Sequence, residues 1–159
     1  MNYPILSSLI LLPSIGALFL FFTKNNNENN ITVKYVALFT SLVNFFLSIY
    51  LWILFDQNTS EFQFIEDRVW IEDLINYKVG VDGISILFII LTTFITPLCI
   101  ISVNNSIKNR LREFLIAVLI MESFMIGVFC SLDLVVFYLF FEAGLIPMFL
   151  IIGIWGGAR

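Results

Sequence analysis

Five long apolar runs, separated by polar segments, set the pattern of this sequence. The runs cover residues 4–22, 33–55, 83–103, 113–130 and 133–154. Each is close to the ~20 residues that a transmembrane α-helix needs, whereas a barrel strand would be ~10 residues of alternating apolar and polar positions. We therefore predict an all-α integral membrane helix bundle of about five transmembrane helices, with residues 1–159 as a single membrane domain.

Composition supports the membrane class and excludes several others. The 159 residues are 60% hydrophobic and 13% charged, with a mean hydropathy of +0.98, which no soluble domain of this size approaches. The net charge of −4 is too small to indicate a nucleic-acid partner. Histidine is absent, and Cys99 and Cys130 lie within or at the end of apolar runs, as packing residues do. The expected partner is the lipid bilayer, and no metal or cofactor site is predicted in this chain.

The polar loop 56–81 is the one long interruption of the pattern. Residues 62–64 and 68–71 suggest two short strands with Glu66 and Asp67 turning between them, as a small hairpin on the membrane surface. Asp82 then stands where it would cap the helix that follows.

The charges divide between the two sides that five spans define. One side holds six of the eight basic residues, and the other holds Arg68 and Lys78. That second side also holds eight carboxylates: Asp56, Glu61, Glu66, Asp67, Glu72, Asp73, Asp82 and Asp133. The positive-inside rule then predicts an N-terminus on the outer side.

Two carboxylates lie inside predicted spans. Glu142 is roughly 13 Å in from Asp133, and Glu122 is roughly 13 Å in from Glu113, at 1.5 Å per helical residue. A charged side chain at that depth costs roughly 3 kcal/mol on insertion scales, so a chain that keeps one there usually uses it. A carboxyl group removed from water takes up and releases protons near neutral pH, which suits a proton relay.

The support for a proton-transfer role differs between the two glutamates. For Glu142 we favour proton transfer over a structural hydrogen bond, because Pro147 follows it and frees the carbonyl of Ala143 for a water molecule. For Glu122, proton transfer and a neutral hydrogen bond to a neighbouring helix stay open. Tyr138 stands one turn before Glu142 and is placed to bond it.

Three further polar or helix-breaking features have structural interpretations. Asp133 is expected to cap the fifth helix, and Pro97 is expected to leave the carbonyl of Thr93 to a threonine hydroxyl or a water. Asn44 and Ser48 lie four residues apart on one face, so hydrogen bonds to neighbouring helices are the favoured interpretation.

The region around Glu142 carries a family resemblance. Residues 132–134 (LDL), 137–142 (FYLFFE) and 145–148 (LIPM), with Trp155 and Gly156, resemble chain 4 of respiratory NADH:ubiquinone oxidoreductase, complex I. Residues 81–85 (VDGIS) match the same family, and residues 55–56 (FD) and 62–64 (FQF) are similar to its mitochondrial branch. The resemblance covers nearly the whole chain and corresponds to the family's N-terminal portion.

The resemblance implies a function that the composition alone does not. It implies a membrane-arm subunit that contributes to proton translocation coupled to NADH:ubiquinone electron transfer, with Glu142 as a proton-pathway residue. It also implies that the flavin and iron–sulfur clusters belong to other subunits, and that the location is the mitochondrial inner membrane, with a bacterial inner membrane as the alternative. The partners it implies are other membrane-arm subunits.

Family members have about fourteen helices, including broken helices whose lysine pairs with the glutamate. This sequence ends where the sixth would start. Either the subunit is split between chains, or this is a fragment, or the remainder was not included. We favour a split subunit, in which a second chain supplies the missing helices. Two other functions stay open: a subunit of a related cation/proton antiporter, and a purely structural membrane-arm scaffold.

Overall fold

The computed structural model describes residues 4–23, 30–71, 75–103, 107 and 110–156. The elements in chain order are α1 (Ile5–Phe22), α2 (Asn30–Leu54), β1 (Gln63–Ile71), β2 (Ile75–Val81), α3 (Ser85–Ser102), α4 (Leu111–Cys130) and α5 (Leu134–Trp155). All five helices are long and apolar enough to cross a membrane, which confirms the predicted fold class. Their ends lie within three residues of the predicted runs.

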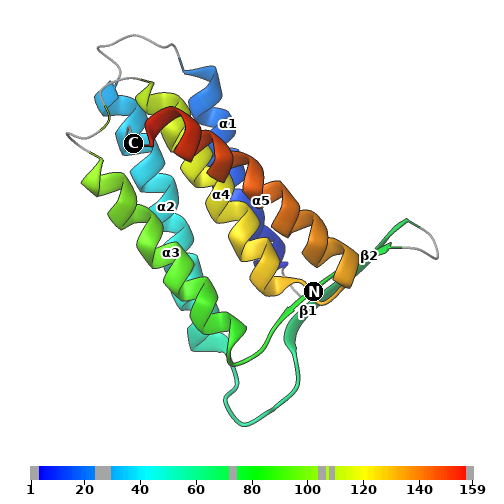
Figure 1. Ribbon diagram of the computed structural model, residues 1–159. Coiled ribbons are helices and arrows are strands. Elements are labelled where there is room, and N and C mark those ends of the chain that lie inside the picture. The colour runs from blue at the N-terminus through cyan, green and yellow to red at the C-terminus, as the bar shows by residue number, and fades with distance from the viewer. Residues whose placement is uncertain (1–3, 24–29, 72–74, 104–106, 108–109, 157–159) are drawn as a thin grey trace.

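The helices form one bundle with the β-hairpin at one end, and the two termini lie at opposite ends (Figure 1). α4 is central and contacts the other four helices, whereas α5 packs on α4 and on β2. The termini lie at opposite ends because the number of antiparallel spans is odd. We call the end that holds the hairpin, Asp82 and Asp133 the acidic end. The opposite end, which holds Lys34, Arg110 and Arg112, is the basic end.

Two apolar clusters fill the bundle, one towards each end. The cluster near the acidic end is built around Leu6, Leu9, Leu51, Ile89 and Ile126. The cluster near the basic end is built around Ala17, Leu20, Val33, Ile100, Leu115 and Leu119. On each helix that contributes residues to both clusters, a mid-span segment lies between the residues of one cluster and those of the other. Buried polar side chains gather in those segments, so the bundle has a polar layer at mid-depth.

The hairpin differs from the sequence-based prediction. Glu66 and Asp67 were predicted to form a turn, but they lie within the single strand β1 and pair with Val79 and Lys78 of β2. The prediction was wrong because β1 is irregular. Its register shifts between Gln63 and Glu66, where Phe64 has a φ of 54°, and such a bulge interrupts the two-residue alternation that marks a strand.

Glu66 fastens the hairpin to the start of α1. Its Oε1 accepts hydrogen bonds from the backbone N–H of Leu6 at 2.9 Å and of Ser7 at 3.2 Å, and its Oε2 accepts one from the Ser7 hydroxyl. The first turn of a helix has unpaired N–H groups and a partial positive charge, so a carboxylate there satisfies both. Tyr77 reaches the Ser7 hydroxyl at 3.1 Å, and burial raises the pKa of Tyr77.

Two aspartates fix the helix starts on the same end of the bundle. Asp133 is the N-cap of α5, as the sequence predicts, and its Oδ1 accepts from the N–H of Val135 and of Val136. Asp82 accepts from the N–H of Ser85 at 2.7 Å, while its own N–H donates to the Ser85 hydroxyl at 2.9 Å. Hydrogen bonds from Ser85 to the carboxylate, first of all the one from its backbone N–H, lower the pKa of Asp82, because they favour the charged form.

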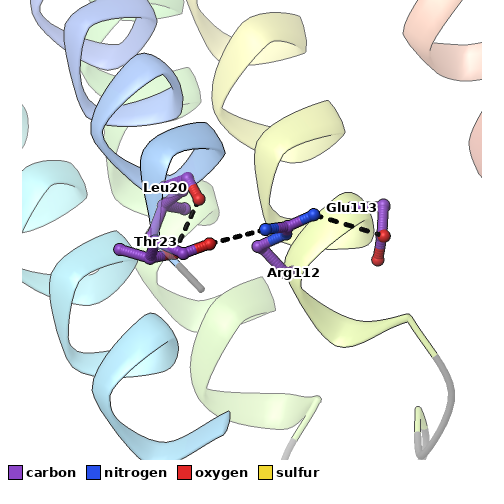
Figure 2. A network of polar contacts seen from close by, with 4 residues as sticks. All are labelled: Leu20, Thr23, Arg112 and Glu113. Carbon is purple, nitrogen blue, oxygen red and sulfur yellow. Dashed lines mark hydrogen bonds and ion pairs between the residues drawn. The ribbon is translucent and has the colours of Figure 1, made fainter. Parts of the chain in front are cut away.

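Arg112 closes the basic end. Figure 2 shows its guanidinium donating to the backbone carbonyl of Thr23 at 2.6 Å, directly after α1 ends, and lying 3.8 Å from the carboxylate of Glu113. A cation at a helix C-terminus meets unpaired carbonyls and the negative end of the helix dipole. Each end of α1 is therefore held by an opposite charge from a distant part of the chain.

The first testable prediction concerns topology. Cysteines introduced as Asn58→Cys at the acidic end and Ile107→Cys at the basic end should react with a membrane-impermeant thiol reagent from opposite faces. The positive-inside rule places the Ile107 position inside. The parent chain, which has only Cys99 and Cys130, gives the background. Labelling of both positions from the same face would refute the five-span arrangement.

The second prediction concerns the carboxylate that joins the hairpin to α1. Glu66→Ala removes three hydrogen-bond acceptor contacts and should cost about 1–2 kcal/mol, the range for losing a helix cap. The measurement is the thermal unfolding midpoint in detergent, with protease sensitivity of the hairpin as a second readout. Glu61→Ala, an exposed carboxylate in the same polar segment, is the matched control. Equal behaviour of the two variants would contradict a capping role.

Candidate functional site

The centre of the polar layer is a bond between α2 and α4. Asn44 Nδ2 donates to Glu122 Oε1 at 2.9 Å. Asn44 is fully buried and Glu122 is only 2% exposed. One turn further along α2, the Ser48 hydroxyl lies 2.7 Å from that of Thr93 on α3. Asn44 and Ser48 therefore bond two different neighbouring helices, which confirms the structural role predicted from their spacing.

A second set of contacts in this layer joins α1 to α4. The Ser14 hydroxyl donates to that of Ser123 at 2.8 Å, and Ser123 donates in turn to the backbone carbonyl of Ile10. Hydroxyls that bond back into the protein leave no unpaired donor in the bilayer. Neither Ser14 nor Ser123 was predicted to take part in the site, since isolated serines are common in spans.

Glu142 has the opposite environment. It is on the outer side of α5, on a surface that the other described elements leave exposed. Of the α5 residues, Val136 and Pro147 are buried. Tyr138, one turn earlier and also exposed, interacts with the Glu142 carboxylate. A mid-span carboxylate on an otherwise apolar exposed surface is unfavourable against lipid, so this surface is built to meet further protein or a water-filled space.

The two glutamates share a depth but not a direction. Glu122 lies eight residues before Cys130, and Glu142 lies eight residues after Leu134, on either side of the short connection between α4 and α5. Both are therefore about 12 Å from that end of their helices. Glu122 is held inside the bundle by α2, whereas Glu142 is exposed on α5. The structure thus provides one enclosed and one accessible carboxyl group at mid-membrane.

The two predicted proline positions lie inside continuous helices. Pro97 is buried in α3 and Pro147 is buried in α5. Near Pro97, the Thr96 hydroxyl donates to the carbonyl of Thr92 at 3.0 Å rather than to that of Thr93. Thr93 instead uses its hydroxyl in the contact with Ser48 and with the preceding turn of α3.

Close packing of small against large residues sets the distance between the helices that carry the glutamates. Gly127 of α4 faces the ring of Phe140 on α5, and a Cβ added at Gly127 would stand 2.7 Å from that ring. Near Gly144, the closest side chain to such an added atom is Phe124, at 3.8 Å. The small residue at Gly127 lets α4 and α5 approach closely, as membrane helices commonly do, whereas an added Cβ at Gly144 would make an ordinary contact.

A cavity of about 880 Å³ opens beside this pair of helices, between α1, α5 and the hairpin. Its lining is largely apolar, and neither Glu122 nor Glu142 lines it. The polar lining residues are Ser7, Ser14, Arg68, Tyr77 and Ser123. Within the described ranges, no three His, Cys, Asp or Glu side chains are grouped closely enough to hold a metal ion.

Five apolar helices of membrane-spanning length define a multi-pass membrane protein. Comparison with known proteins identifies the family. Residues 7–128 match the family model for the amino terminus of NADH-ubiquinone oxidoreductase chain 4. This chain belongs to that family.

Individual relatives agree with the family model. NADH-ubiquinone oxidoreductase chain 4 of Marchantia polymorpha is 48% identical over 158 residues, which are 99% of this chain and 32% of the relative. The chain 4 protein of Arabidopsis thaliana is 47% identical over 97% of this chain and 31% of its own length. NADH-quinone oxidoreductase subunit M of Rhodobacter capsulatus is 59% identical over 78% of this chain and 24% of its own length. The chain thus spans about a quarter to a third of these relatives.

The third prediction tests the α4–α5 contact. Gly127→Ala should force the Phe140 ring aside and destabilise the bundle by about 1–3 kcal/mol, the usual cost of overpacking. Phe140→Leu, which shortens the opposing side chain, should recover part of that loss in the double variant. The measurement is the thermal unfolding midpoint of each single and double variant in detergent. Gly153→Ala, in open space on α5, is the control, and additive effects of the two changes would contradict the contact.

Proposed function

We propose that this chain is a proton-translocating component of the membrane arm of complex I, coupled to NADH:ubiquinone electron transfer. Family membership supports the complex, and the position of Glu142 supports the role. Glu142 stands at mid-membrane on an accessible helix surface, next to the hydroxyl of Tyr138. A carboxyl group placed in this way can exchange a proton with a group on an opposing helix.

The exposed surface of α5 also supports a proposal about partners. We infer that other membrane-arm subunits, including a second chain with helices that this sequence does not contain, cover Glu142 and bring a cationic side chain to it. A cation there would offset the cost of holding the carboxylate in the membrane, and its movement would change the proton affinity of Glu142. Electron transfer then takes place in other subunits, which hold the flavin and the iron–sulfur clusters. The proposed location is the mitochondrial inner membrane.

The fourth prediction separates proton transfer from scaffolding. Glu142→Gln keeps size and hydrogen bonding but cannot titrate, so proton uptake into sealed vesicles should fall by roughly tenfold or more while the complex still assembles. A positioned proton-transfer group typically contributes roughly 10²-fold or more. Glu142→Asp keeps the titrating group one methylene shorter and should be milder, and Glu122→Gln should be milder still.

The measurement is NADH-driven proton uptake together with NADH:quinone activity, each normalised to the amount of assembled complex. Phe141→Leu, a change in size at the neighbouring exposed position, is the matched control and should leave pumping intact. Normal pumping by Glu142→Gln would make Glu142 a structural residue and favour the scaffold. Purification of the chain in a complex that lacks iron–sulfur and flavin subunits would favour the related antiporter.

A further inference from the structure

Four atoms of the polar layer, two from Asn44 and two from Glu122, indicate the protonation state of Glu122. Asn44 Nδ2 donates to Glu122 Oε1, which satisfies one atom of each group. The remaining two atoms, Asn44 Oδ1 and Glu122 Oε2, are buried and have no hydrogen-bond partner among the described residues. In an ionised Glu122 both of these oxygens are acceptors, so neither can satisfy the other.

A single proton on Glu122 provides a hydrogen bond for both of these oxygens. A protonated carboxyl group has one O–H donor and one carbonyl acceptor. A primary amide has one carbonyl acceptor and two N–H donors, one of which lies on the same side as the carbonyl oxygen. The two planar groups are therefore complementary: the amide N–H donates to one acid oxygen, and the acid O–H donates to the amide oxygen. We propose that Glu122 rests in its protonated form as an acid–amide pair with Asn44, with the proton on Oε2 donated to Asn44 Oδ1.

The charges around this pair support the neutral form. In the described parts of the five helices, the other charged side chains are Lys34, Arg112, Glu113 and Glu142. Lys34 is ten residues from Asn44 on α2, and Arg112 is ten residues from Glu122 on α4, so each is about 15 Å away along its helix. α1 and α3 supply no charged residue, and α5 supplies only another carboxylate. No cation on these helices is placed to pair with an ionised Glu122.

The two glutamates then have different roles in proton transfer, an inference that rests on the proposed function. Glu142 is the exposed group that exchanges protons with a partner. Glu122 keeps its proton because it is buried with no cation on these helices placed to pair with it, and Asn44 holds the acid form in place with two hydrogen bonds. Asn44 is thus a positioning residue: it acts through Glu122 and makes that side chain a proton reservoir beside the pathway. This explains why Glu122→Gln should be milder than Glu142→Gln, since glutamine can also pair with the Asn44 amide.

The test is infrared spectroscopy of the assembled complex in lipid membranes at neutral pH. The native complex should show a carboxylic-acid C=O band that shifts in D₂O and is lost in Glu122→Gln. Asn44→Leu should move this band to higher frequency, as for a carboxyl group with weaker hydrogen bonds. Asn44→Ser, a smaller change, provides the same comparison if Asn44→Leu does not assemble.

Ser48→Ala is the matched control, because Ser48 lies one turn from Asn44 on the same helix but bonds Thr93. It should leave the band in place. Absence of any protonated band that depends on Glu122, or a band unchanged by both Asn44 variants, would overturn the acid–amide pair. The infrared bands do not depend on pumping activity. The Glu142 experiment therefore tests the proposed function separately, even if this inference fails.

Discussion

The absence of water in the bilayer core is the constraint on which this structure depends. A polar group in a spanning helix must find its partner within the protein, because lipid offers none. Six polar side chains of this bundle find partners in pairs between helices: Asn44 with Glu122, Ser48 with Thr93, and Ser14 with Ser123. They lie at one depth, between two apolar clusters that contain no charged side chain.

The same constraint explains how the ends of the bundle are built. Glu66 pairs with the unpaired N–H groups at the start of α1, and Arg112 pairs with a carbonyl directly after its end. Both contacts join segments far apart in the sequence, so they also fix the hairpin and α4 against α1. Glu142 differs from Glu122, because it is exposed and its described hydrogen-bond partner, Tyr138, lies on its own helix. That exposure is the observation from which we propose a proton-transfer role for Glu142.

Much of this arrangement follows from local sequence patterns. Apolar runs of membrane-spanning length predicted the five helices, and the spacing of Asn44 and Ser48 predicted contacts with neighbouring helices. The position of Asp133 before the fifth run predicted its cap. Each of these features depends on residues a few positions apart, where helix geometry alone determines which groups share a face.

Long-range features were beyond such patterns. The bulged register of β1 hid the strand that carries Glu66, and nothing local links Glu66 to a helix start about 60 residues earlier. The depth of Glu122 and Glu142 could be counted along their helices, but their directions could not. Which of them is enclosed depends on where α2 packs against α4, and that is decided by the shapes of many apolar side chains together.

A structure of the assembled membrane complex that contains this chain would test the central claim most directly. The account predicts that the Glu142 surface of α5 is covered by a helix from outside this sequence, with a lysine or arginine nitrogen within about 4 Å of the carboxylate or joined to it by one water molecule. It is contradicted if lipid tails cover that surface, or if the helix opposite Glu142 offers only apolar side chains.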